Sequence, residues 1–134
     1  MLFEPTDRKS FAGYSPTLNH VLLNELDNVR NRVYVLTRKD GKWTREPLPG
    51  MPEFGTVSAS GVDDEESDDY FLTVTDYLTP TSLSLGTAGK GPAEKLKQLP
   101  AYFDAKGLAV TQHEVASKDG TRIPYFQVAR KDLA

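Results

Sequence analysis

Short alternating runs of apolar and polar residues recur along the chain, and this pattern predicts β-strands rather than helices. A first group contains a short apolar run at residues 19–26, which predicts a buried strand, a run rich in β-branched and aromatic residues at 32–37, and a returning strand at 43–48. Between the second and third runs lies Asp40-Gly41, a pair that readily takes the positive φ angles of a tight hairpin. Pro47 cannot donate a backbone hydrogen bond, so we expect it at a strand end or on an edge strand.

The first group begins after Ser15-Pro16-Thr17, which are typical turn residues, and ends at the Pro- and Gly-rich loop 49–52. A second group follows, with strand-like runs at residues 55–62, 70–77 and 82–85. Each group has about the size of one β-propeller blade, a four-stranded sheet built from ~40–50 residues. The pattern therefore predicts two successive blade-like sheets.

The segment after the second group changes character. Residues 88–92 have the composition of a flexible linker, and residues 93–99 predict one or two helical turns before Pro100. Strand-like runs at 108–115 and 122–128 then flank a turn with its own Asp-Gly pair, which predicts a terminal hairpin. The predicted fold class is all-β, with antiparallel sheets that resemble β-propeller blades and a terminal β-hairpin.

Composition narrows the classes of function. The chain has 134 residues, 38% of them hydrophobic, and a formal net charge of −3. These values suit a globular domain and argue against a surface for nucleic acid. Because the chain contains no cysteine, disulfides, thiolate catalysis and cysteine-ligated metals are excluded. No apolar stretch reaches the ~20 residues that span a bilayer, and residues 1–7 do not predict a secretion signal.

Three stretches give the chain a family resemblance. They are residues 5–10 running into 19–23, residues 68–83, and residues 117–125, whose sequence is Ser-Lys-Asp-Gly-Thr-Arg-Ile-Pro-Tyr. In this order they resemble the prolyl oligopeptidase family of serine peptidases, in particular its bacterial members. The third stretch is the most specific, because in that family a Ser-Lys-Asp-Gly-Thr-x-Ile-Pro turn lies in the first hairpin of the catalytic domain.

The resemblance implies a position within a larger enzyme, in which a seven-bladed propeller caps an α/β-hydrolase domain. Residues 1–100 are then expected to form the last blades, and residues 101–134 the incomplete opening hairpin of the hydrolase domain, with the boundary near Pro100 to Asp104. The family's catalytic serine, acid and histidine lie downstream, and this sequence contains no Gly-x-Ser-x-Gly elbow. We therefore assign no catalytic, cofactor-binding or metal-binding residue, and expect that only the parent is an enzyme.

A separate triad within this chain needs a serine, an imidazole and a carboxylate in hydrogen-bond sequence. His20 borders an apolar run and His113 lies in an alternating strand, so structural roles are favoured for both. Ser15, Ser58 and Ser117 become candidate nucleophiles only if the chain alone hydrolyses a peptide.

Two other motifs have a functional and a structural interpretation. The acidic run 63–69 offers many oxygens for Ca²⁺ but lacks the spacing of an EF-hand loop, which favours a solvated loop that discourages edge pairing. The glycine-rich stretch does not form a phosphate-binding loop, because Gly91-Pro92 follows Lys90 where Ser or Thr is required. Its glycines are Gly86, Gly89 and Gly91.

A cluster of basic residues interleaved with Tyr34 and Trp43 was considered as a nucleic-acid surface. Alternation with apolar residues and the negative net charge favour the solvated face of a hairpin instead. The basic residues are Arg30, Arg32, Arg38, Lys39, Lys42 and Arg45.

The expected function is that of a non-catalytic propeller portion that gates access of short peptides to the active site of a peptidase cleaving after proline. The alternative is a stand-alone β-module that binds a peptide or protein by strand-edge pairing. Expected partners are the parent's remaining blades and hydrolase domain, its peptide substrates, and a second copy paired through exposed strand edges. We expect no cofactor, nucleic acid or membrane partner, and the parent's compartment, cytoplasmic or periplasmic, stays open.

Overall fold

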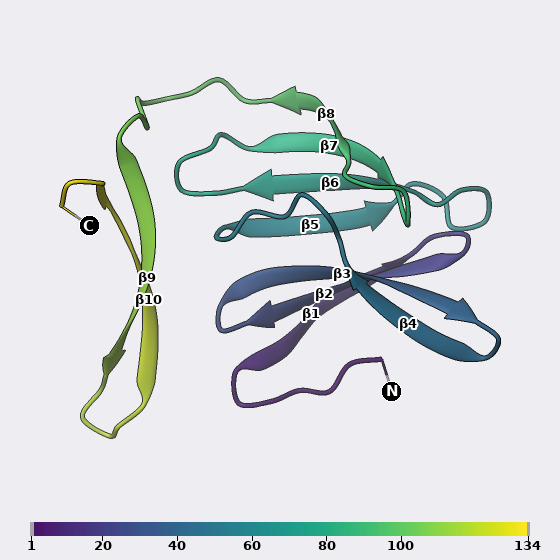
Figure 1. Ribbon diagram of the computed structural model, residues 1–134, viewed down its shortest axis with the longest axis horizontal. Helices are drawn as coiled ribbons and strands as arrows, with labels where there is room; N and C mark the ends of the chain where they lie inside the picture. Colours follow the sequence, from purple (N-terminus) through teal and green to yellow (C-terminus); the bar gives the residue numbers. More distant parts are fainter. Residues whose placement is uncertain (1, 134) are drawn as a thin grey trace.

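The computed structural model describes residues 2–133, and Figure 1 shows that they form three antiparallel β-sheets. The first sheet contains β1 (Lys9–Pro16), β2 (His20–Asp27), β3 (Arg30–Lys39) and β4 (Lys42–Pro47). The second sheet contains β5 (Thr56–Gly61), β6 (Asp69–Thr75), β7 (Ser82–Thr87) and β8 (Glu94–Gln98). A separate hairpin contains β9 (Leu108–Ala116) and β10 (Arg122–Arg130). The predicted all-β fold class is confirmed.

Both four-stranded sheets keep the strands in chain order, so every strand pairs with its sequence neighbour. Residues 48–55 lead from β4, at one edge of the first sheet, to β5, at an edge of the second. Strand β5 then contacts β1, β2 and β3, which places the edge strand of the second sheet across the first. This is the succession of sheets expected for neighbouring propeller blades.

The tight turns follow the local chemistry of their residues. Asp40 and Gly41 have φ angles of 51° and 75°, so the predicted hairpin between β3 and β4 is confirmed. Pro47 ends the edge strand β4, where no ladder donor is needed. Asn28 and Val29 turn the chain between β2 and β3 with φ angles of 49° and 63°. The sequence pattern ends the first run at Asp27-Asn28, in agreement with this turn, although positive φ is unusual for a β-branched residue such as Val29.

The helical turns predicted for residues 93–99 are wrong, because this segment forms strand β8. Seven residues between Pro92 and Pro100 are too few for a stable isolated helix. The same residues gain backbone hydrogen bonds by pairing with the free edge of β7. The preceding residues 88–92 form the β7–β8 turn, and Ala88 is buried in the core rather than in a flexible linker.

Strand β1 was not predicted, and the turn expected at Ser15-Pro16-Thr17 begins two residues too early. Ser15 and Pro16 still pair with Leu22 and Val21 of β2. Pro16 is tolerated because it is the last residue of a strand at the edge of the sheet. The ladder also contains a bulge between Phe11 and Gly13, which interrupts the alternation that would have signalled a strand.

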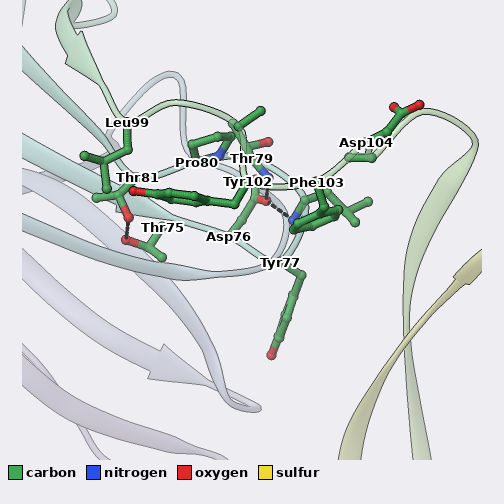
Figure 2. Close-up of a pocket in the computed structure, with 13 residues that line it drawn as sticks. Thr75, Asp76, Tyr77, Thr79, Pro80, Thr81, Leu99, Tyr102, Phe103 and Asp104 are labelled. Carbon is green, nitrogen blue, oxygen red and sulfur yellow. Dashed lines mark hydrogen bonds between the residues drawn. The ribbon is translucent and has the colours of Figure 1, made fainter.

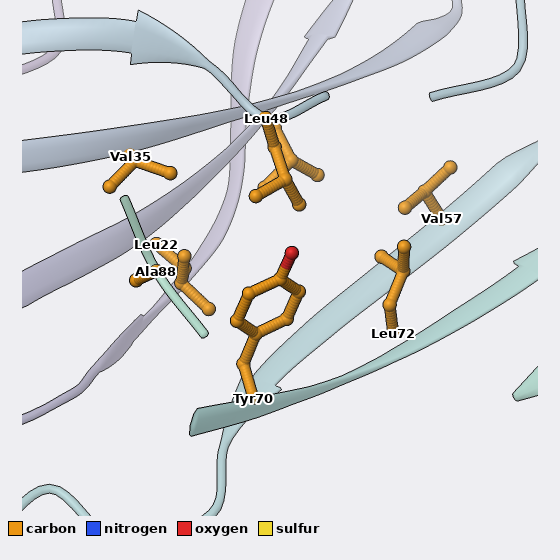
Figure 3. Close-up of a cluster of buried hydrophobic side chains, with 8 residues drawn as sticks. Leu22, Val35, Leu48, Val57, Tyr70, Leu72 and Ala88 are labelled. Carbon is orange, nitrogen blue, oxygen red and sulfur yellow. The ribbon is translucent and has the colours of Figure 1, made fainter. Parts of the chain in front are cut away.

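One apolar core lies between the two four-stranded sheets (Figure 3). The first sheet and the loop after it contribute Leu22, Val33, Val35 and Leu48, and the second contributes Val57, Tyr70, Leu72 and Ala88. Tyr70 has 0% of its surface exposed, and its ring fills the space next to Gly86. A Cβ atom added at Gly86 would lie 2.6 Å from Cζ of Tyr70, so only glycine leaves room for this ring.

Polar contacts also join the two sheets, and Asp68 of the β5–β6 loop is their centre. Its carboxylate accepts hydrogen bonds from the Thr17 hydroxyl at 2.9 Å, the Asn19 backbone N–H at 2.7 Å and the Asn19 side chain at 2.8 Å. Burial opposes ionisation of Asp68, but these hydrogen bonds and the nearby His20 outweigh it and lower the pKa of Asp68. Asp68 therefore holds the second sheet to the β1–β2 turn of the first.

Candidate functional site

The terminal hairpin contacts loops of both four-stranded sheets, at the end of the molecule where Figure 1 places β9 and β10. We call this contact region the hairpin junction. It consists of Arg8, Asn28, Arg30, Glu53, Phe54, Tyr77, Gln112, Glu114 and Phe126.

The polar part of the junction joins β9 to the first sheet. The Arg30 guanidinium donates from Nε to the side-chain oxygen of Gln112. Gln112 in turn donates from Nε2 to the backbone oxygen of Asn28 at 3.1 Å. Arg8 donates to Glu114 at 3.1 Å, close to the edge of the same sheet. The unusual turn at Asn28 thus presents a carbonyl oxygen that the hairpin recognises.

The aromatic part joins β10 to the loop after β4, the last strand of the first sheet, and to the loop after β6, the second strand of the second sheet. The ring of Phe126 lies 5.5 Å from Phe54 in an edge-to-face arrangement and 5.2 Å from Tyr77. The Arg30 guanidinium lies 4.6 Å from the centre of the Phe54 ring, within the range of a cation–π contact. Phe54 comes from the β4–β5 loop and Tyr77 from the β6–β7 loop, so Phe126 reaches both sheets at once.

A groove of about 430 Å³ opens beside the junction, between the β6–β7 loop and residues 99–105 (Figure 2). Tyr77, Pro80, Leu99, Tyr102 and Phe103 line it, so apolar contact outweighs acid–base chemistry there. The Asp76 carboxylate accepts backbone hydrogen bonds from Leu78 at 2.7 Å and Thr79 at 2.5 Å. That carboxylate therefore shapes the loop instead of facing a ligand.

The structure gives the serines and histidines considered for a triad the following partners. Ser15 accepts a hydrogen bond from the Gly61 backbone N–H at 2.9 Å. The Nδ1 atom of His20 lies 2.8 Å from the Thr37 hydroxyl oxygen. His113 lies 2.8 Å from the Thr111 hydroxyl oxygen, and its ring stacks on Tyr125.

The other two serines have different surroundings. Ser58 is exposed on β5, and the Ser117 hydroxyl donates to Asp119 within the turn between β9 and β10. This hydrogen bond and the one from the Thr121 backbone N–H lower the pKa of Asp119 to about 2. The Ser-Lys-Asp-Gly-Thr turn is thus fixed by its own aspartate.

Two carboxylates of the acidic run accept hydrogen bonds within the chain. Asp63 accepts hydrogen bonds from the backbone N–H groups of Glu65 at 2.9 Å and Glu66 at 3.1 Å, and Asp69 accepts one from the Thr87 hydroxyl at 2.7 Å. Across residues 2–133, no group of three or more histidines and acids is placed to hold a metal ion. In the same range, no helix has the length and apolar character needed to cross a membrane.

Two of the basic residues are engaged by other groups of the chain. Arg30 belongs to the hairpin junction, while Arg45 lies 2.7 Å from Glu25 and 3.6 Å from the centre of the Tyr34 ring. Burial disfavours the Arg45 cation, but Glu25 and Tyr34 more than offset this and raise the pKa of Arg45. These two cations are therefore engaged within the chain, on different parts of the sheet.

Sequence reasoning missed the hairpin junction. Arg30 was considered only as a surface cation, and Gln112, its partner, is 82 positions away along the chain. Phe126 appeared only as an alternating strand residue. The available signal was Phe54, an aromatic residue between the loop 49–52 and the run 55–62, whereas Tyr77 was placed in the strand-like run 70–77.

Comparison with known proteins tests the resemblance. No protein-family model matches the sequence. An uncharacterised peptidase of Sinorhizobium fredii is 41% identical over 133 residues, which make up 99% of this chain and 18% of that protein. The structure of a post-proline cleaving enzyme from Rickettsia typhi is 27% identical, with a TM-score of 0.78 over 97% of this chain and 18% of that one. The chain matches a segment of a prolyl oligopeptidase-family peptidase.

A further solved structure, from a study of two prolyl endopeptidases, agrees with this assignment. It is 26% identical, with a TM-score of 0.80 over 98% of this chain and 19% of that one. The recognition of the prolyl oligopeptidase family and the blade-like fold class are therefore confirmed. The chain spans 18% of the length of the curated relatives it matches.

Proposed function

We propose that this chain supplies non-catalytic structure to a serine-type peptidase that cleaves short peptides after proline. In this proposal residues 1–100 are two late blades of the propeller and residues 101–134 open the hydrolase domain. The observation that carries it is the joint match of both blade-like sheets and the terminal hairpin to a prolyl endopeptidase, at a TM-score of 0.80. A protein that shared only a generic β-sheet would not also reproduce the hairpin after the second sheet.

The hairpin junction gives this proposal a physical basis for gating. Phe126 touches loops that belong to both sheets, and Gln112 binds a turn of the first. A movement of the sheets away from the hairpin must separate these contacts, so the junction resists opening between the two parts. Blades held in this way restrict entry to short, unfolded peptides, and the chain contributes shape rather than chemistry.

The absence of catalysis by the chain itself is tested directly. We expect the 134-residue protein to leave a chromogenic Gly-Pro peptide intact and to remain unlabelled by a serine-directed phosphonate. A post-proline cleaving enzyme serves as the positive control for both reagents. Turnover together with labelling of Ser15, Ser58 or Ser117 would refute the proposal and make that serine the nucleophile.

The gating role is tested in a chimera. Here this chain replaces the matching segment of the Rickettsia typhi enzyme, to which it aligns over 97% of its length. We expect the chimera to hydrolyse the chromogenic Gly-Pro peptide and to leave a folded protein with an exposed Gly-Pro loop uncleaved. A matched chimera with Phe126→Ala should cleave the folded protein more readily. A folded chimera that cleaves both substrates equally, with or without Phe126, argues against gating.

A further inference from the structure

Two turns of the chain share the sequence Lys-Asp-Gly, and both lie between paired strands. Asp40-Gly41 joins β3 to β4, and Asp119-Gly120 lies in the turn between β9 and β10. The sequence contains no other Asp-Gly pair and no Asn-Gly pair. Because the residues on either side of the aspartate are the same at both sites, a difference in their chemistry has to come from the structure around them.

An aspartate that is followed by glycine is open to rearrangement of the backbone. The glycine nitrogen can attack Cγ of the aspartic acid, because glycine has no side chain to obstruct the approach. A C–N bond forms, the hydroxyl of the neutral carboxyl leaves with the amide proton as water, and a five-membered succinimide results. A water molecule then opens the ring. Where it breaks the bond from the nitrogen to the original backbone carbonyl carbon, the product is isoaspartate, whose mass equals that of aspartate.

The turn at Asp119 holds both of the groups that would react. The Asp119 carboxylate accepts hydrogen bonds from the Ser117 hydroxyl and from the Thr121 backbone N–H. The attacking atom is engaged as well, since the Gly120 backbone N–H donates to the Ser117 carbonyl oxygen at 3.0 Å. Ring closure has to break these hydrogen bonds first. The pKa of Asp119, lowered to about 2, also makes the neutral carboxyl scarcer by a factor on the order of ten or more.

The turn at Asp40 holds neither group. Among residues 2–133, no hydrogen bond or ion pair engages the Asp40 carboxylate, which is exposed at the tip of the β3–β4 hairpin. In the same range the Gly41 backbone N–H has no partner, because the strand ladder ends at the pair Lys39 and Lys42. A Cβ atom added at Gly41 would meet nothing within 4 Å. The carboxyl and the nitrogen that form the ring are therefore free to approach each other.

The β3–β4 turn stays accessible when neighbouring blades are present. Strand β3 runs from Arg30, in the hairpin junction, to Lys39, and its ten residues span about 30 Å. Asp40 therefore lies at the end of the first sheet opposite β9 and β10, as Figure 1 shows. Neighbouring blades pack on the faces of a sheet, whereas this turn projects from its end. A complete propeller thus leaves the turn in contact with solvent.

We propose that Asp40 is a site of spontaneous conversion to isoaspartate, through a succinimide formed with Gly41, while the hydrogen bonds of its own turn protect Asp119. The rearrangement adds one methylene group to the backbone of a two-residue turn and leaves a free α-carboxylate at its tip. The turn then no longer matches the pairing of Lys39 with Lys42. The inference concerns the backbone of this chain and does not rest on the proposed peptidase function.

Incubation of the folded 134-residue protein at mildly acidic pH, followed by peptide mapping of both sites, tests the proposal. Because the mass does not change, isoaspartate is recognised by a shifted retention time and by resistance to an endoproteinase that cleaves before aspartate. We expect isoaspartate at residue 40 to exceed that at residue 119 by about tenfold or more. In concentrated urea the two sites should rearrange at similar rates, because their local sequences match.

Two variants serve as matched controls, and circular dichroism checks that both keep their strands. Asp40→Glu keeps the charge but cannot form the five-membered ring, so the product at residue 40 should disappear while residue 119 is unchanged. Ser117→Ala removes one hydrogen bond to Asp119 and should increase isoaspartate there without changing residue 40. Equal isoaspartate at both sites of the folded protein, none at residue 40, or a difference that persists in urea would overturn the proposal.

Discussion

At Gly86, a single added methyl group would meet a buried aromatic ring of the core. A Cβ atom there would lie 2.6 Å from both Cζ and the hydroxyl oxygen of Tyr70, and 2.9 Å from Cε1. Tyr70 is completely buried between the two sheets, so its ring cannot move aside into solvent. We therefore expect Gly86→Ala to push two packed sheets apart or to force the Tyr70 ring from its preferred rotamer.

The size of the effect follows from two opposing contributions. Overpacking a well-filled core costs about 1–3 kcal/mol. Replacing glycine with alanine also restricts the unfolded chain, which returns about 0.4–1 kcal/mol where the backbone is not in the left-handed region, as at Gly86. The free energy of unfolding should therefore fall by about 1–2 kcal/mol in Gly86→Ala.

A double-mutant cycle separates this clash from other effects of the substitution. In a Tyr70→Leu background the ring is absent, and Gly86→Ala should then be neutral or stabilising, with a coupling energy of about 1–3 kcal/mol. Urea denaturation followed by circular dichroism gives the four free energies at one protein concentration. The control background is Phe71→Leu, which changes the outward neighbour on the same strand. Additivity within about 0.5 kcal/mol in the Tyr70 cycle would refute the reasoning.

Three further perturbations test other parts of the structure. Tyr70→Phe should raise the free energy of unfolding by about 1 kcal/mol in urea denaturation, because the buried hydroxyl has no partner among residues 2–133; a loss of stability would reveal a partner. Asp68 has a lowered pKa in the folded protein, so its stabilising contribution is present above its unfolded pKa of about 3.9 and is lost as pH falls through the folded pKa. Asp68→Asn should therefore have a lower free energy of unfolding than the unchanged protein at pH 7. In urea denaturations over a series of pH values, the difference between the two proteins should shrink as pH falls. A difference that stays constant with pH would contradict this sign. Phe126→Ala should speed amide hydrogen exchange in β9 and β10 without affecting β5–β7. The control Tyr125→Ala, on the opposite side of β10, should leave exchange in the hairpin unchanged. Equal protection of the hairpin in both variants would show that other contacts hold it.

Local chemistry explains which parts of the fold the sequence pattern predicted. The Asp40-Gly41 turn depends only on residues that accept positive φ, so it was visible without knowledge of the rest. Strand β2 was recognised as a short apolar run bounded by turn residues, and β6 as the strand-like run at residues 70–77. Strand β8 was mistaken for helical turns because its pairing with β7, not its own composition, decides its conformation.

The hairpin junction could not be predicted because its partners are distant in sequence. Gln112 recognises the carbonyl oxygen of Asn28, and that carbonyl is presented only because the turn adopts positive φ angles. The position of Phe126 between two loops likewise depends on the placement of both sheets. Family resemblance located the chain within a longer enzyme, but the contacts that join its parts required the structure.

The pairing of every strand with its sequence neighbour has a consequence for how the chain folds. Each pair of neighbouring strands closes only a short loop, so the contact order within a sheet is low. Either sheet can therefore form by adding one hairpin after another. The contacts at Asp68 and in the Tyr70 core need residues of both sheets. As the polypeptide leaves the ribosome, the first sheet can therefore form while the second is still being synthesised, and its inner face stays bare until residues 56–88 arrive.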